Sequence, residues 1–115
     1  MSEKKIPEDK QELQNKIQDI QIIEQSLNNL LYQKQAFQLE FNETENALSE
    51  ISKTNDDIYK LVSNIMIKAD KKNIEEELRK KKDLLSLRLK SIEKQEEGLS
   101  KSLEELREDI LKNIK

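Results

Sequence analysis

The sequence predicts a mainly α protein: a long antiparallel coiled-coil hairpin with one β-hairpin at the connection, which oligomerises through that β-hairpin. Three observations support this fold class. Apolar residues recur in heptads through both halves of the 115-residue chain. The central segment IYKLVSNIMIKA, residues 58–69, is rich in strand-forming residues. Residues that favour turns and helix caps, SKTNDD at 52–57, precede this segment.

The composition favours a narrow buried stripe over a thick core. Charged residues make up 39% of the chain and apolar residues 34%, while Gly and Pro occur once each. Cysteine and histidine are absent, which excludes disulfides, thiol chemistry, and the commonest zinc ligands and general base. The 21 basic and 24 acidic residues are well mixed along the chain. We therefore expect neither a cofactor nor a metal site.

The composition also bears on location. The first ten residues, MSEKKIPEDK, have no apolar segment of the kind that a secretory signal contains. No run approaches the roughly 18 apolar residues that a membrane span needs. We therefore expect a cytoplasmic protein with no membrane partner.

The first half contains a coiled-coil seam. Its two rows are spaced by seven residues and offset by three, which is the alternating spacing of packed helices. Lys34 and Thr44 are the polar positions within these rows. The first row is Leu13, Ile20, Leu27, Lys34, Phe41 and Leu48, and the second is Ile23, Leu30, Phe37, Thr44 and Ile51.

The second half repeats the pattern. Lys82 and Glu96 interrupt its second row, and Gly98 falls on the outer face of the helix. The first row is Leu78, Leu85, Ile92, Leu99 and Leu106, and the second is completed by Leu89, Leu103 and Ile110. Since both halves carry a seam of similar length, we expect two helices that pack against each other in antiparallel orientation.

The boundaries follow from capping signals. Pro7 suits the first turn of a helix, and we expect this helix over residues 8–54. Asp70 or Asn73 can cap a second helix over residues 71–114, with Glu75–Glu77 in its first turn. The chain, residues 1–115, then forms a single domain with the β-hairpin at 58–69.

The β-hairpin is the predicted assembly element. Ser63-Asn64 is a suitable two-residue turn, since Asn tolerates a positive φ. An isolated two-stranded hairpin is marginal in water, and its unpaired edges invite pairing with other strands. Apolar residues lie on both faces, so one coiled coil cannot cover them; an irregular loop over the helix ends is the alternative. The predicted oligomer hub comprises Ile58, Tyr59, Leu61, Val62, Ile65, Met66 and Ile67.

Four features of the chain resemble the β-type subunits of prefoldin. QKQAFQLEFNETENALSEI (33–51) resembles the end of the family's first helix, and DDIYKLVSNIMIK (56–68) resembles its single hairpin with the Tyr-Lys signature. LRLKSIEKQEEGLSKSLEEL (87–106) resembles the second helix, and the chain length also matches. The chain departs from the family at Ser63, where the family usually has glycine, so Ser63-Asn64 must form the turn.

The resemblance implies an ATP-independent co-chaperone. Its members assemble as two α-type and four β-type subunits through their hairpins, hold unfolded client proteins at the coiled-coil tips, and deliver them to a group II chaperonin. Ile17, Ile22 and Leu111 lie off the seam and should be partly exposed. The predicted client-binding tip comprises Ile6, Leu13, Ile17, Ile20, Ile110, Leu111 and Ile114.

Three other classes compete with this interpretation. A structural coiled-coil scaffold or tethering subunit would bind one defined partner and no generic clients. A nucleic-acid-gripping arm is disfavoured by the net charge of −3, although Arg79–Lys90 is locally basic. Catalysis is disfavoured because no carboxylate pair has a His, Cys or Gly-rich loop beside it. The sequence therefore predicts no enzyme and no nucleic-acid partner.

Overall fold

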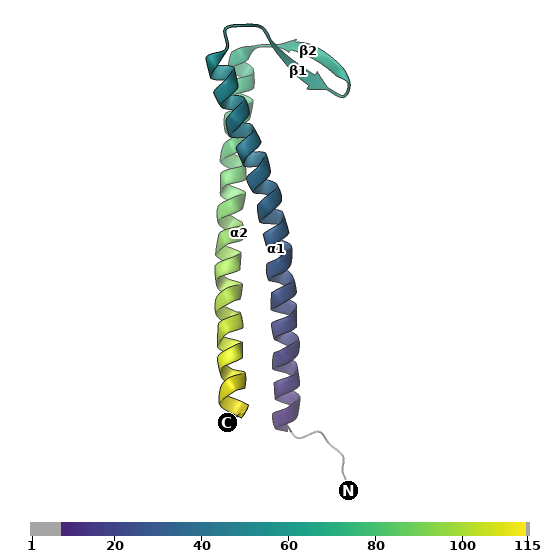
Figure 1. The fold of residues 1–115 in the computed structure, drawn as a ribbon, viewed down its shortest axis with the longest axis vertical. Coiled ribbons are helices and arrows are strands. Elements are labelled where there is room, and N and C mark those ends of the chain that lie inside the picture. Colours follow the sequence, from purple (N-terminus) through teal and green to yellow (C-terminus); the bar gives the residue numbers. More distant parts are fainter. Residues whose placement is uncertain (1–7, 115) are drawn as a thin grey trace. The chain divides into compact units, whose positions relative to one another are not determined.

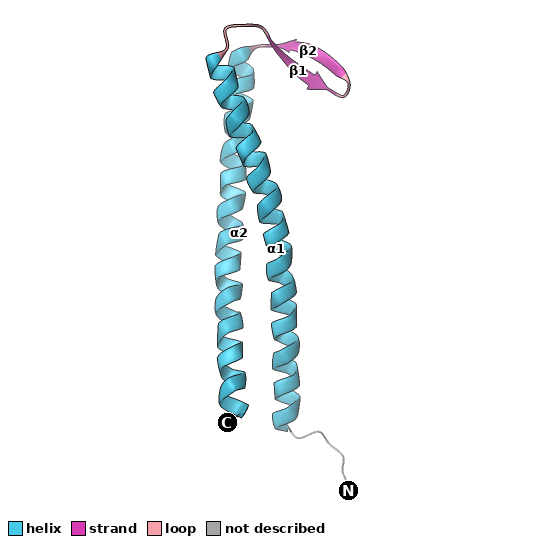
Figure 2. Cartoon of the chain, in the orientation of Figure 1, coloured by secondary structure: helices cyan, strands magenta, loops and turns pink. Residues whose placement is uncertain are grey.

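Two long helices flank one β-hairpin in the chain. The computed structural model describes the backbone of residues 8–114 and the side chains of residues 10–112. The predicted fold class is confirmed, as two long helices with a two-stranded antiparallel sheet between them. Figures 1 and 2 show the elements in chain order: α1 (Glu8–Lys53), β1 (Ile58–Val62), β2 (Ile65–Ala69) and α2 (Lys71–Ile114).

The chain divides into two compact units. Residues 34–91 form one unit, here called the hairpin unit because it contains β1 and β2. The described part of the other unit comprises residues 8–33 of α1 and 92–114 of α2, here called the terminal pair. In each unit the α1 and α2 segments run in opposite directions (Figure 1).

Contacts in the hairpin unit fix the antiparallel register there. Glu45 of α1 lies 3.4 Å from the ammonium of Lys82 of α2. Nearer the β-hairpin, Lys71 at the start of α2 contacts Thr54, just after α1. Leu85 is the most deeply buried side chain in this unit. Residues later in α1 thus contact residues earlier in α2, as in an antiparallel pair.

The terminal pair is held by the same kind of seam. Leu30 of α1 and Ile92 and Leu103 of α2 are buried. An ion pair of 3.7 Å joins Glu24 of α1 to Arg107 of α2. Every position of the two predicted seam rows, in either unit, is buried or half-buried. The heptad interpretation is therefore confirmed.

Polar residues in the seam find partners without leaving it. Thr44 is buried, and its Oγ1 donates a hydrogen bond of 2.7 Å to the carbonyl of Glu40 one turn earlier. The ammonium of Lys82 lies 5.8 Å from the ring centroid of Phe41 and also pairs with Glu45. Lys82 therefore keeps its aliphatic stem in the seam and its charge at the rim.

The helix boundaries differ slightly from the expected ones. Helix α1 ends at Lys53, one residue before the expected end, a difference within the usual spread of such assignments. Asp70 occupies the N-cap of α2, since its carbonyl accepts a 3.0 Å hydrogen bond from the amide of Ile74. The expectation that Glu75–Glu77 lie in the first turn is wrong. Because α2 begins at Lys71, its first turn contains Lys71 and Lys72, and the glutamates fall in the second turn.

Two further observations complete the fold. Gly98 is exposed, and a Cβ built on it would meet nothing within 4 Å. It therefore lies on the outer face, as expected, and has no close-packing role.

Among residues 8–114, neither helix contains a stretch long and apolar enough to cross a membrane.

Candidate protein-interaction site on the β-hairpin

The β-hairpin has two faces, defined by its register. Residues directly opposite each other in an antiparallel pair point to the same face. One face carries the pairs Ile58–Ala69, Lys60–Ile67 and Val62–Ile65, and the other carries Tyr59–Lys68 and Leu61–Met66. Both faces therefore present mainly apolar side chains, as the sequence predicts.

Most of these side chains are exposed. Leu61, Ile65 and Met66 each expose about two thirds of their surface, at 67%, 65% and 66%. Tyr59, Val62 and Ile67 are exposed as well, whereas Ile58, at the base of the hairpin, is half-buried. Exposed apolar surface of this kind is typical of surfaces that another protein covers.

The strands also offer unpaired backbone groups. The sheet has only the order β1–β2, so each strand has one neighbour among the described residues and one open edge. Open edges are templates for strand addition by another chain. The hairpin therefore presents both open strand edges and apolar faces.

The turn at the end of the hairpin is formed by Ser63 and Asn64, as predicted, because Val62 pairs with Ile65. The positive φ expected for Asn64 is instead found at Ser63, which has a φ of 55°. A positive φ at the first central residue alone is typical of a type II′ turn. This position is the one at which the prefoldin-like pattern has glycine.

Two ion pairs involve residues of the β-hairpin. Lys60 of β1 reaches Glu77 of α2 at 3.2 Å. On the other face, Lys68 lies 3.6 Å from Asp57, the residue before β1. These pairs are exposed, so each contributes little by itself. The first pair links β1 to α2, and the second lies within the base of the hairpin.

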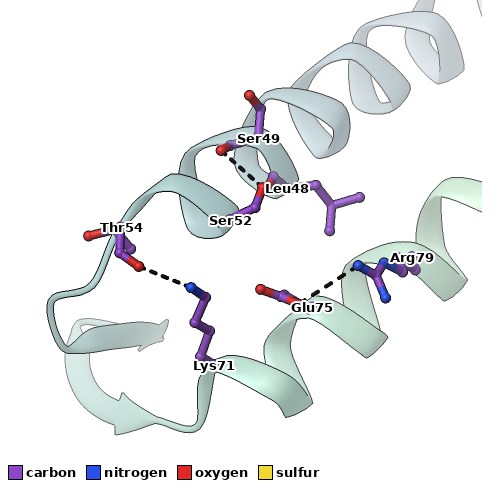
Figure 3. Close-up of polar contacts among 7 residues, drawn as sticks. All are labelled: Leu48, Ser49, Ser52, Thr54, Lys71, Glu75 and Arg79. Atoms are coloured by element: carbon purple, nitrogen blue, oxygen red, sulfur yellow. Dashed lines mark hydrogen bonds and ion pairs between the residues drawn. The ribbon is translucent and has the colours of Figure 1, made fainter.

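A stronger contact lies where the helices meet the hairpin. The Lys71 ammonium donates a 3.0 Å hydrogen bond to the carbonyl of Thr54, and Figure 3 shows it reaching across from α2. Glu75 pairs with Arg79 along α2, and Ser52 bonds back to carbonyls of its own helix. The bond from Lys71 therefore ties the end of α1 to the start of α2.

The predicted tip residues within the described region belong to the terminal pair. Leu13, Ile20 and Ile110 are half-buried in the seam, whereas Ile17 and Leu111 are exposed, as is Ile22. The exposure expected for off-seam positions is thus found. Ile6 lies outside the described residues, and so does the side chain of Ile114.

The sequence interpretation did not single out five further exposed apolar residues. They occupy off-seam positions of both helices, and that position is the signal that could have revealed them. They are Leu31, Tyr32 and Leu39 of α1 and Leu84 and Leu87 of α2. Within the described part of the chain, no cluster of acidic residues has the geometry to hold a metal ion.

Comparison with known proteins gives a consistent result. A family model described as prefoldin subunit matches residues 11–115. The prefoldin subunit beta of Saccharolobus islandicus (strain L.S.2.15) is 38% identical over 112 residues, covering 96% of this chain and 86% of that protein. The prefoldin subunit beta of Pyrobaculum islandicum is 39% identical over 111 residues, covering 95% and 86%.

A solved structure agrees with the sequence relatives. The crystal structure of the prefoldin beta subunit from Thermococcus strain KS-1 matches with a TM-score of 0.80 and 33% identity. The match covers 86% of this chain and 89% of that one. The family match, the relatives and the shared fold lead to one conclusion: the chain belongs to the prefoldin family of chaperones, among its beta-type subunits.

Proposed function

We propose that the chain is a subunit of an ATP-independent holdase, which captures unfolded proteins at its coiled-coil tips and transfers them to a group II chaperonin. The observation that carries this proposal is the β-hairpin, whose apolar side chains are exposed on both faces. A hairpin of this kind is stable when other chains cover it. Membership of a chaperone family supports the same conclusion.

The proposed assembly contains two α-type and four β-type prefoldin subunits. Both edges of the β1–β2 sheet are open to strand pairing, and both faces are apolar. These features suit a hub in which each hairpin has neighbours on more than one side. The relatives named prefoldin subunit beta support a partnership with other prefoldin subunits.

Client binding is proposed for the terminal pair. Ile17, Ile22 and Leu111 expose apolar surface there, so each can make a weak contact with an unfolded chain. Several subunits in one assembly would add such contacts by avidity, and weak individual contacts allow release without nucleotide. No cofactor is required for this mechanism, and we expect it to operate in the cytoplasm.

The hub assignment is tested by placing charge on the hairpin. We expect the double substitution Ile65→Asp and Ile67→Asp to dissociate the oligomer while leaving helicity intact, because charged side chains would have to be buried between subunits. The chain is co-expressed with its α-type partner, and its mass is measured by native mass spectrometry. Circular dichroism reports helicity. Full-size particles from the substituted chain would contradict the assignment.

The chain offers a matched control. Leu84 and Leu87 of α2 expose 48% and 64% of their surface, similar to the 51% and 65% exposed by Ile67 and Ile65. Leu84→Asp with Leu87→Asp therefore makes the same chemical change on a helix instead of the hairpin. We expect this control to retain the assembled mass. Recovery of the native chain from its own cells with one unrelated partner would instead favour a tethering scaffold.

A further inference from the structure

Charge is distributed unevenly between the two units. The described residues of the terminal pair carry twelve acidic and six basic side chains, a net charge of −6. Residues 34–91, the hairpin unit, carry eleven acidic and twelve basic side chains, a net charge of +1. The acidic excess of the whole chain therefore lies in the unit that is proposed to bind clients.

One flank of the terminal pair combines this charge with apolar surface. Ile17, Glu24 and Leu31 of α1 recur every seven residues and so share one side of the helix. Ile17 and Leu31 expose 42% and 43% of their surface. The row therefore alternates an apolar, an acidic and an apolar side chain.

Helix α2 supplies the other half of this flank. Arg107 contacts Glu24 at 3.7 Å, which places Arg107 beside the α1 row. Leu111, one turn after Arg107, is 62% exposed, and Glu104, almost one turn before it, is also exposed. We call Ile17, Glu24, Leu31, Glu104 and Leu111 the acidic flank.

A shallow groove lies within the terminal pair beside these residues. Its volume is about 400 Å³. Three leucines provide its apolar lining, and two carboxylates and an amide provide its polar lining, with no lysine or arginine among the described residues that line it. The lining residues are Leu27, Leu31, Leu103, Glu24, Glu96 and Asn28.

We propose that the acidic flank and its groove select unfolded polypeptide segments in which apolar residues alternate with lysine or arginine. This inference rests on the proposed holdase function and names the client chemistry of that site. The leucines and isoleucine supply affinity by apolar burial. The carboxylates supply selectivity, because a local negative potential attracts cationic segments and repels acidic ones.

The Arg107–Glu24 ion pair is weak enough for a client to displace it. Both side chains are more than half exposed, at 58% and 52%, so the pair is weak and solvent-screened. A cation of the client can therefore replace Arg107 beside Glu24 at small cost. The same screening makes the selectivity dependent on salt concentration.

The experiment measures binding of three labelled peptides to the assembled full-length protein by fluorescence anisotropy. The peptides have the same apolar residues and length, and carry lysine, glutamine or glutamate at every polar position. We expect the lysine peptide to bind about tenfold more tightly than the glutamate peptide at low salt, with the glutamine peptide between them. At about 0.5 M salt the three affinities should converge, because charges are then screened within a few ångströms.

Substitutions test whether the preference for the lysine peptide arises from the acidic flank. Glu24→Gln with Glu104→Gln should remove most of the preference for the lysine peptide over the glutamate peptide at low salt. The control is Glu43→Gln with Glu50→Gln, an equal charge change on exposed glutamates of α1 in the hairpin unit. The control should keep the preference. Ile17→Ser with Leu31→Ser should weaken binding of all three peptides.

The outcomes separate this inference from the proposed function. Equal binding of the three peptides at low salt would overturn the selectivity while leaving the holdase function standing. An equal loss of preference in the flank and control variants would assign it to net charge and overturn the flank as its source. Failure of every peptide to bind would overturn the holdase function itself.

Discussion

Ser63 occupies a backbone conformation that residues other than glycine seldom adopt. Its φ of 55° lies in the left-handed region, where the Cβ atom crowds the following carbonyl. The hairpin accepts this strain because a two-residue connection with the required twist needs a positive φ at its first position. Asn64, the more tolerant residue, stands one place too late to relieve it.

Replacement of this residue should stabilise the protein. We expect Ser63→Gly to increase the free energy of unfolding by about 0.5–1 kcal/mol, since the strain removed exceeds the entropy that glycine adds to the unfolded chain. Urea unfolding of the full chain measures the change. Asn64→Gly is the matched control, and we expect no gain from it because only Ser63 has a positive φ. A gain at Asn64 alone would contradict the assignment of strain to Ser63.

At the scale of the elements, a lysine at the start of α2 stabilises the end of α1. Lys71 lies in the first turn of α2, where a positive charge opposes the helix dipole. Its ammonium instead donates to the carbonyl of Thr54, directly after the last residue of α1. A cation at the carboxyl end of a helix is favourable. Lys71 thus acts as a C-terminal cap for α1, supplied by α2.

The capping role predicts a specific loss. We expect Lys71→Met to lower the free energy of unfolding by about 0.5–1.5 kcal/mol, the usual worth of one hydrogen bond. It should also speed amide hydrogen exchange in the last turn of α1. Lys72→Met removes the same charge from the next, exposed position of α2, so its effect on α1 should be negligible. Equal exchange rates in the two variants would contradict the capping role.

At the scale of the whole molecule, folding and assembly should be linked. The exposed apolar side chains of the β-hairpin gain stability only when other chains cover them. A partner that binds the folded chain alone stabilises it by mass action. We therefore expect the stability of this protein to depend on its assembly with other chains.

This linkage predicts a dependence on protein concentration. We expect the apparent stability to rise by about 1 kcal/mol for each tenfold increase in concentration of the assembled subunits. Thermal melts at several concentrations, followed by circular dichroism, measure it. The Ile65→Asp and Ile67→Asp double variant should melt at a temperature that does not depend on concentration. Concentration-independent melting of the unsubstituted protein would argue against obligate assembly.

The two helices, the seam and the β-hairpin were predictable from the amino-acid sequence alone. These features depend on spacing and propensity over a few residues, and the heptad rows around Leu30 and Leu85 are readable without any tertiary contact. The exposure of Ile17 and Leu111 followed from the same spacing. The bounds of α2 were also predictable, although the residues expected in its first turn were wrong.

The contacts between residues distant in the sequence could not be predicted in this way, because they depend on how the elements pack. The partner of Lys82, the reach of Lys71 to Thr54 and the φ of Ser63 depend on the register between elements. The acidic flank has the same origin, because Glu24 and Glu104 are far apart along the chain and share one flank only when α1 and α2 pair in the terminal pair. Local patterns act over a few residues, whereas electrostatic potential sums over whatever the fold brings together.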